Sequence, residues 1–181
     1  MVSQRGIEAN LEKVKAILDM TSLRSVKEVQ RLMGRIAALN RFVSRATDKC
    51  LPFFKTLKQA FHWTDECEAA FQALKDYLSK PPLLSLSVQG EDLFLYLVVS
   101  QTAVSSALIR EEFQIQRPVY YISQAFQGAE ARYPRIEKLV FALIIASRKL
   151  HPYFQAHTIL VMTNQPLRKT MGRLDVAGRM V

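Results

Sequence analysis

The chain has 181 residues, of which 49% are hydrophobic, and a formal net charge of +9 at pH 7. This length allows one domain or two small ones, and the hydrophobic content predicts a globular fold and excludes a mainly disordered chain. The basic charge favours a polyanionic partner, nucleic acid first and an anionic membrane second. Because no stretch reaches the ~18 apolar residues of a membrane helix, we expect no membrane partner.

The two cysteines, Cys50 and Cys67, do not have the spacing of metal ligands. We expect each to be a small buried apolar residue. Such sparse cysteine usage suits a reducing cell interior, and the opening residues contain no apolar run typical of a signal peptide. We therefore expect an intracellular protein, either cytoplasmic or nuclear.

The first fifty residues predict a short strand and two helices. Residues 1–9 read as the end of a strand that turns through Gly6 with no partner strand before it. Apolar residues at helical spacing predict a helix over residues 10–20. A second helix is expected to begin at Ser25, because Ser25 and Glu28 form a capping box in which each side chain accepts from the other residue's amide.

A basic stripe follows the second helix on the side away from its apolar face. Lys27, Arg31 and Arg35 fall four residues apart, and Arg41 and Arg45 extend the charge. One interpretation is an ordinary solvated helix face. The other is a helix that follows the phosphate backbone of a nucleic-acid duplex. These five residues are the candidate nucleic-acid ligands of the chain.

The remaining chain predicts a connecting helix and then a mixed sheet. Thr64 is a suitable N-cap for a helix that ends before the prolines at 81 and 82. Strands are expected over residues 94–100, 103–110, 118–123 and 158–163. A long helix over residues 133–154 separates the last two strands, and Pro166 opens a short final helix. We therefore predict an α/β (α+β) fold, a helical part followed by a mixed sheet with flanking helices.

These segments resemble the reverse transcriptase and ribonuclease H region of gypsy-type LTR retrotransposon polyproteins. The resemblance is carried by the helix sequence of residues 28–43, by the Trp63-to-Leu83 pattern, and by Ser100, Ala103 and Leu108 in the first hairpin. The phrases at residues 117–123, 132–138 and 148–157 resemble plant elements in particular.

The resemblance implies a division of the chain into four parts. Residues 1–9 would be the end of the reverse transcriptase palm, and residues 10–50 would be thumb helices. Residues 51–90 would form a connecting helix and linker. Residues 91–181 would form a ribonuclease H-like domain that is truncated at its C-terminal end.

The family's nuclease uses two magnesium ions held by carboxylates. Aligned on local motifs, its ligand positions fall at Val98, Leu139 and Asn164, none of which is a carboxylate. Glu137 is a possible residual ligand, but two residues on a helix correspond to ~200° of rotation, so it faces nearly opposite to Leu139. We therefore expect no intact catalytic site, no metal site and no bound Mg²⁺.

The resulting hypothesis is a non-catalytic fragment of a retrotransposon polyprotein. It would act as a connection or tether and bind the backbone of an RNA–DNA hybrid or duplex weakly and without sequence preference. Its other partner would be the remainder of the polyprotein, in the virus-like particle of such elements. One alternative is an active hybrid nuclease with a rearranged metal site that uses Glu137 and Asp92. Another is a relic reading frame without function.

Overall fold

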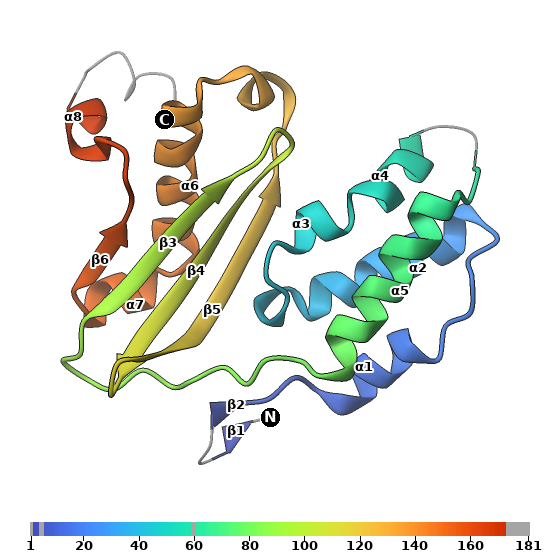
Figure 1. Ribbon diagram of the computed structural model, residues 1–181, viewed down its shortest axis with the longest axis horizontal. Helices are drawn as coiled ribbons and strands as arrows, with labels where there is room; N and C mark the ends of the chain where they lie inside the picture. Colours follow the sequence, from blue (N-terminus) through green and yellow to red (C-terminus); the bar gives the residue numbers. More distant parts are fainter. Residues whose placement is uncertain (1, 4–5, 59–60, 173–181) are drawn as a thin grey trace.

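The structure, a computed structural model, describes residues 2–3, 6–58 and 61–172. A layer of helices built by the first half of the chain lies beside a β-sheet built by the second half, and further helices cover the far face of that sheet (Figure 1). None of the helices among the described residues has the length and hydropathy to cross a membrane.

The helical layer begins with β1 (Val2–Ser3) and β2 (Gly6–Ile7), which pair as a small antiparallel ladder. The segment that was expected as one strand end turning through Gly6 is thus two short strands, and Val2 pairs with Ile7. Five helices and a short 3₁₀ helix follow. They are α1 (Leu11–Leu18), α2 (Val26–Ala38), η1 (Asn40–Phe42), α3 (Ala46–Lys49), α4 (Leu51–Lys58) and α5 (Asp65–Ser79).

Side-chain caps fix where these helices start. The Ser25 hydroxyl accepts from the Glu28 amide at 3.3 Å, as predicted, while the Glu28 carboxylate accepts from the Arg24 amide at 2.6 Å and not from that of Ser25. The Thr64 hydroxyl accepts from the Cys67 amide at 3.3 Å, which confirms Thr64 as the N-cap of α5. Each cap satisfies an amide that the first helical turn leaves without a partner.

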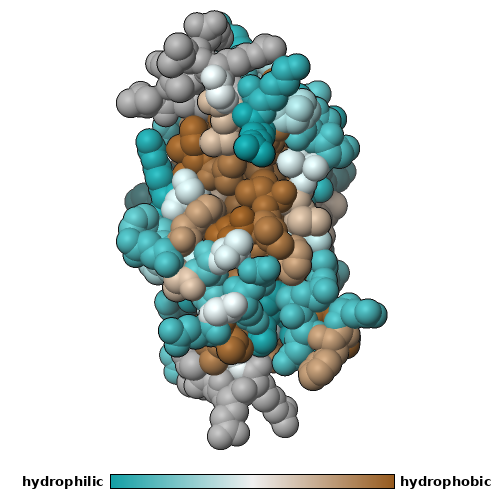
Figure 2. Space-filling view, turned by 90° about the vertical axis from the view of Figure 1, so that its left-hand side faces the viewer, coloured by the Kyte–Doolittle hydropathy of each residue, from teal (hydrophilic) through white to brown (hydrophobic). Residues whose placement is uncertain are grey.

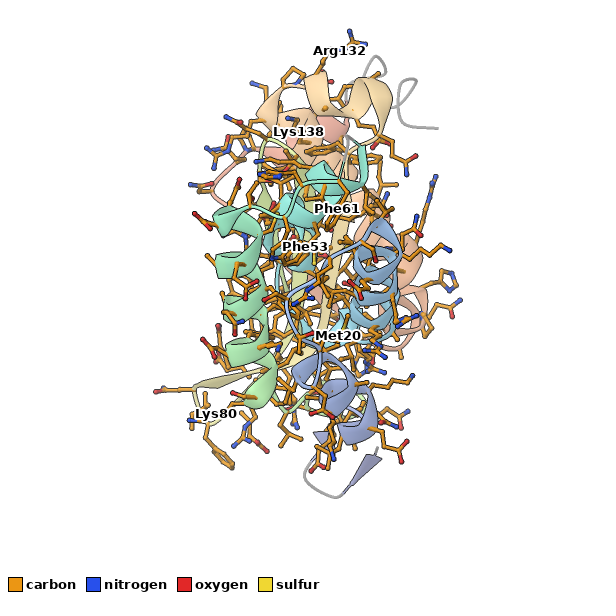
Figure 3. All side chains as sticks on the ribbon, turned by 90° about the vertical axis from the view of Figure 1, so that its right-hand side faces the viewer. Met20, Phe53, Phe61, Lys80, Arg132 and Lys138 are labelled. Atoms are coloured by element: carbon orange, nitrogen blue, oxygen red, sulfur yellow. The ribbon has the colours of Figure 1, made fainter. Side chains whose placement is uncertain are left out.

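Aromatic side chains form the centre of the helical layer. Figure 3 looks onto this layer and shows Phe53 between α5 and α2. The Phe53 ring stacks on Trp63 with centroids 5.8 Å apart, and Trp63 meets Phe71 edge-on at 6.1 Å. Cys50 and Cys67 are free and buried in the same cluster, as expected. Burial raises the pKa of the Cys50 thiol to about 12, so it stays protonated and unreactive.

The sheet contains β3 (Leu93–Val99), β4 (Ala103–Glu112), β5 (Ile115–Ala125) and β6 (Ile159–Met162) in the order β5-β4-β3-β6. The first three pair antiparallel, and β6 pairs parallel to β3. A crossover makes that parallel pairing possible. It consists of η2 (Gly128–Arg132), α6 (Arg135–Lys149) and α7 (His151–Ala156), and α8 (Leu167–Met171) follows β6.

Two predicted elements differ from the structure. The long helix expected over residues 133–154 is divided at Leu150, because Pro152 cannot continue α6 and instead opens α7. The hairpin between β4 and β5 is tighter than expected. Its turn contains only Phe113 and Gln114, both at positive φ (52° and 63°), so each strand is longer than predicted.

The helical layer is attached to the sheet through β4 and β5. The Thr47 amide of α3 donates to the Ser123 hydroxyl at 3.0 Å, and Ser123 in turn hydrogen-bonds Ser105 of β4 at 3.0 Å. The linker between α5 and β3 is hydrogen-bonded to both parts of the molecule. Leu84 exchanges backbone hydrogen bonds with Ile7 of β2, and the Ser85 amide donates to the Pro118 carbonyl of β5 at 2.7 Å. The two halves therefore form one packed unit.

Tyr77 fixes the segment between α2 and α3, because its hydroxyl donates to the Phe42 carbonyl at 2.9 Å and accepts from the Ser44 amide at 3.3 Å. We expect Tyr77→Phe to lower the free energy of unfolding by about 1–2 kcal/mol in urea denaturation, since two backbone groups lose their partner. Tyr133→Phe is the matched control, because no hydrogen bond of the Tyr133 hydroxyl is found among the described residues. Equal stabilities of the two variants would contradict this role of Tyr77.

Candidate nucleic-acid interface

A groove of about 440 Å³ runs between α1 and α2 on the outside of the helical layer. Its floor is made by small residues, Ala16, Gly34 and Ala38. Its rim carries three cations and one carboxylate, from Lys13, Arg31, Arg35 and Glu12, so the rim is basic on balance. A Cβ placed on Gly34 would have no atom within 4 Å, so the floor is open to the outside. A groove with a floor of small residues and a rim of net positive charge lets a phosphodiester chain approach closely.

The three residues of the predicted stripe do not play the same part. Lys27 and Arg31 are exposed, and neither belongs to an ion pair found among the described residues. Arg35 is half-buried, and its guanidinium donates to the carbonyl of Ala16. Arg35 therefore holds α1 against α2, which corrects the expectation that all three side chains lie free on the solvent face.

Arg41 and Arg45 do not extend the stripe. The Arg41 guanidinium lies over the Tyr120 ring of β5, 4.7 Å from the centroid, so it faces the sheet and not the groove. Arg45 has a left-handed backbone (φ 51°) and pairs with Asp48 at 3.0 Å. Both roles depend on tertiary contacts that helical spacing alone does not reveal.

The sequence analysis missed Lys13 and the small residues of the groove floor. Lys13 comes from α1, a helix that showed only an apolar face in the sequence. Gly34 and Ala38 are four residues apart on α2, so they share a face with each other and lie beside Arg31 and Arg35. That spacing of small residues was the available signal.

The three expected nuclease positions are not gathered at one place. Leu139 on α6 is 6% exposed, and its cluster is packed by Leu97 and Val99 of β3. Val98 lies between those two residues and is 43% exposed, so it is on the opposite face of the sheet. Asn164 is exposed in the loop after β6.

Glu137 is buried in the first turn of α6, with 9% of its surface exposed. Asp92 is exposed and precedes β3, whereas the start of α6 packs at the end of β3 near Val99. The seven residues of β3 separate them by roughly 20 Å. No group of three His, Cys, Asp or Glu side chains that could hold a metal ion occurs among the described residues. The side chains at these positions therefore do not fit a magnesium site.

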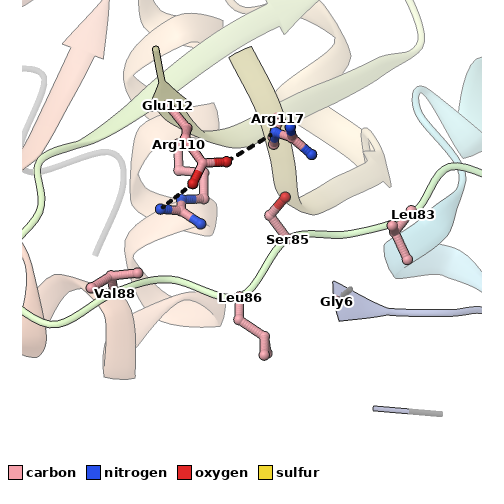
Figure 4. Close-up of a pocket in the computed structure, with 8 residues that line it drawn as sticks. All are labelled: Gly6, Leu83, Ser85, Leu86, Val88, Arg110, Glu112 and Arg117. Atoms are coloured by element: carbon pink, nitrogen blue, oxygen red, sulfur yellow. Dashed lines mark ion pairs between the residues drawn. The ribbon is translucent and has the colours of Figure 1, made fainter. Parts of the chain in front are cut away.

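A second hollow, of about 520 Å³, lies where the linker passes the far end of β4 and β5 (Figure 4). The charged side chains that line this hollow already form ion pairs with neighbouring residues. Arg110 pairs with Glu91 at 3.1 Å, and Glu112 pairs with Arg117 at 3.3 Å and with Arg110 at 3.9 Å. The Arg110–Glu91 pair fastens the linker to the sheet, and the two pairs of Glu112 lie within the β4–β5 hairpin, so little charge is left for a ligand.

A family profile described as "RNase H-like domain found in reverse transcriptase" matches residues 63–161. The chain is 26% identical, over 99% of its length, to the retrovirus-related Pol polyprotein from transposon opus of Drosophila melanogaster, and covers 19% of that protein. It is 28% identical over 83% of its length to that from transposon 412 of the same fly, covering 12% of it. The Gag-Pol polyprotein of avian reticuloendotheliosis virus is 23% identical over 76% of the chain, which covers 12% of it. The chain thus spans less than a fifth of these relatives.

Solved structures show the same fold. A foamy viral protease–reverse transcriptase in complex with an RNA/DNA hybrid superimposes with a TM-score of 0.73 at 22% identity, over 93% of this chain and 24% of that one. The foamy viral protease–reverse transcriptase in complex with dsDNA superimposes with a TM-score of 0.71 at 19% identity, over 96% of this chain and 37% of that one. The predicted mixed sheet with flanking helices is therefore confirmed as an RNase H-like arrangement.

The different parts played by Arg31 and Arg35 can be measured by replacing each with Gln. We expect Arg35→Gln to lower the free energy of unfolding by about 1–2 kcal/mol, because the Ala16 carbonyl loses a charged donor. Arg31→Gln removes the same charge from an exposed site and should stay within about 0.5 kcal/mol of the parent. Chemical denaturation compares the two. Equal effects would show that Arg35 does not hold α1.

Proposed function

The chain belongs to the family of RNase H-like domains found in reverse transcriptases, and on that premise we propose that it binds a nucleic-acid duplex through its backbone without cleaving it. The groove between α1 and α2 carries this proposal. Phosphate contacts need exposed cations and a surface without protruding side chains. Lys13, Arg31 and Gly34 supply both in the groove, and Lys27 lies one helical turn before Arg31 on α2. Binding through phosphates is independent of sequence, because phosphate contacts carry no sequence information.

Two observations support this choice of ligand. The net charge of +9 favours a polyanion. The foamy viral reverse transcriptases that share the fold were solved with dsDNA and with an RNA/DNA hybrid. An RNA–DNA hybrid and a DNA duplex present the same phosphate chemistry to the groove, so we propose that both bind.

The absence of cleavage is proposed from the side chains at the expected ligand positions. Two-metal hydrolysis needs hard oxygen ligands on facing elements. Leu139 supplies an apolar side chain instead, and Val98 lies on the other face of the sheet. Asn164 could offer only a neutral carbonyl. The domain would then serve as a rigid connection between a polymerase and the rest of a polyprotein.

The assignment of the chain to a particular type of retrotransposon is also a proposal. The phrases at residues 117–123, 132–138 and 148–157 favour a gypsy-type LTR element of a plant, with the chain inside a virus-like particle in the cytoplasm or nucleus. The division into palm end, thumb helices, linker and RNase H-like domain belongs to the same proposal. Sequencing the genomic DNA on both sides of the reading frame tests it, because gypsy-type elements encode an integrase downstream of this region.

Duplex binding is tested by the salt dependence of affinity. We expect log Kd for an RNA–DNA hybrid to vary with log salt at about 0.9 per phosphate neutralised, and Lys27→Gln with Arg31→Gln to reduce that slope by up to about 2 units. The control pair Lys80→Gln with Lys149→Gln removes the same charge from exposed sites elsewhere. Fluorescence anisotropy measures both slopes.

Gly34→Leu tests whether the duplex lies in the α1–α2 groove. The new side chain enters open space, and Leu is a better helix former than Gly. The free energy of unfolding should therefore rise by about 0.5–1 kcal/mol. Affinity should nevertheless fall, because the side chain blocks the groove. A variant that is more stable and binds the duplex as well as the parent would place the ligand elsewhere.

The purified chain should release no product from a labelled RNA–DNA hybrid in either Mg²⁺ or Mn²⁺. Denaturing gel electrophoresis over a long incubation gives the readout, and Glu137→Gln is the informative control. Cleavage that depends on metal and disappears in Glu137→Gln would overturn the non-catalytic assignment and favour the rearranged nuclease site.

A further inference from the structure

A cavity of about 130 Å³ lies where the helical layer meets the sheet. Its walls come from α2, η1, α3, α4 and β5. Figure 2 shows another apolar area, on the side of the molecule that carries β6, but α8 beside it leads to the end of the described chain at Gly172. The cavity, by contrast, receives no residue from either end of the described chain.

Most of the cavity wall is apolar. Met33 and Ile36 come from α2, Ala46 and Cys50 from the two ends of α3, and Phe54 from α4. Ile36, Ala46 and Cys50 are buried, whereas Met33 and Phe54 are partly exposed and so lie toward the mouth. An apolar cavity of about this volume holds one benzene-sized molecule, because water finds too few hydrogen-bond partners in it.

One polar region interrupts the apolar wall. The buried Ser123 hydroxyl accepts from the Thr47 amide and hydrogen-bonds the Ser105 hydroxyl, both at 3.0 Å. A serine hydroxyl has one donor and two acceptor positions, so one position of Ser123 remains for a ligand. Asn40 also lines the cavity, and no hydrogen bond of its side-chain amide is found among the described residues.

The wall selects for a neutral aromatic ligand. None of the described residues that line the cavity is charged, and an ion placed against an apolar wall loses its hydration without compensation. The Phe54 ring and the Met33 thioether both make favourable contacts with aromatic rings. A second ring would exceed the volume, so the ligand has one ring and one polar group for Ser123.

We propose that this cavity binds a neutral monocyclic aromatic molecule that carries one hydroxyl group, a ligand of the phenol class. The ring packs against Met33, Ile36 and Phe54, and the hydroxyl hydrogen-bonds Ser123. The ligand contacts the helical layer and β5 at once, so it stabilises their attachment. The cavity and the α1–α2 groove lie on opposite faces of α2, so the proposal does not depend on duplex binding.

Phenol itself is the probe. It is titrated into the whole chain while the backbone amide chemical shifts are followed by NMR. We expect saturable shifts that are largest at Thr47, Cys50 and Ser123. Toluene fills the same volume without a hydroxyl. The ratio of the toluene Kd to the phenol Kd should therefore fall by about three- to tenfold in Ser123→Ala, the equivalent of one hydrogen bond.

Two neighbouring alanines of α2 give a matched pair of variants. Both are exposed, but Ala37 lines the cavity and Ala38 lines the α1–α2 groove. Leu has nearly the helix propensity of Ala, so both variants should fold. Ala37→Leu should weaken phenol binding at least about tenfold, because its side chain fills the mouth, while Ala38→Leu leaves the phenol Kd unchanged. Duplex binding should fall only in Ala38→Leu, which separates failure of one proposal from failure of the other.

Several results would overturn the proposal. They are the absence of saturable shifts up to the solubility limit of phenol, shifts centred away from the cavity, and equal weakening in the two alanine variants. An unchanged ratio of Kd values in Ser123→Ala would also overturn it, because the hydroxyl would then have no part in binding. If Ser123→Ala does not fold, the shift map and the alanine pair still decide the outcome.

Discussion

The attachment of α3 to β4 and β5 is the contact on which the remaining geometry depends. The Thr47 amide is held by Ser123, which is itself held by Ser105, and Asp48 accepts from the Ser100 hydroxyl at 2.8 Å. These bonds are short polar links between two separate apolar cores. Because α3 follows α2 closely, they fix the α1–α2 groove relative to the sheet. They also place the helical layer over β4 and β5, which leaves the β3 and β6 half of that face uncovered.

The packing of α6 explains why the scaffold is stable without carboxylates at the expected nuclease positions. Leu139 and Val140 pack on Leu97 and Val99, so this end of α6 is held by apolar contacts. A cluster of carboxylates at the same place would repel each other and would need metal ions to offset the repulsion. An apolar side chain at position 139 stabilises the helix without any ligand. The fold of the family is thus compatible with a purely structural use of this site.

Sequence reasoning predicted the elements set by local chemistry. The caps at Ser25 and Thr64, the four main strands in order and the crossover were all recognised from periodicity and from turn or cap residues. The predicted helix boundaries were less accurate where a single residue decides them. Pro152, for example, divides α6 from α7 within what was predicted as one helix. Within the candidate interface, the helical spacing correctly selected Lys27 and Arg31 as exposed cations.

The remaining errors come from contacts between segments distant in the sequence. Arg35 meets the Ala16 carbonyl and Arg41 meets the Tyr120 ring, and neither partner can be inferred from spacing within one helix. Val98 was placed by its position in a motif, but strand alternation puts it on the face away from Leu139. The cavity beside Ser123 became visible only in the structure, because its walls come from segments that are distant in the sequence.

The most direct test of the account is to map which lysines a duplex protects. The chain is acetylated with and without an RNA–DNA hybrid, and the modified residues are quantified by mass spectrometry. Binding in the α1–α2 groove predicts protection of Lys13 and Lys27, with Lys80, Lys149 and Lys169 unchanged, although all five are exposed in the free chain. Protection of Lys149 and Lys169 with Lys13 and Lys27 still fully reactive would contradict the account and place the nucleic acid on the face of the sheet that α6 covers.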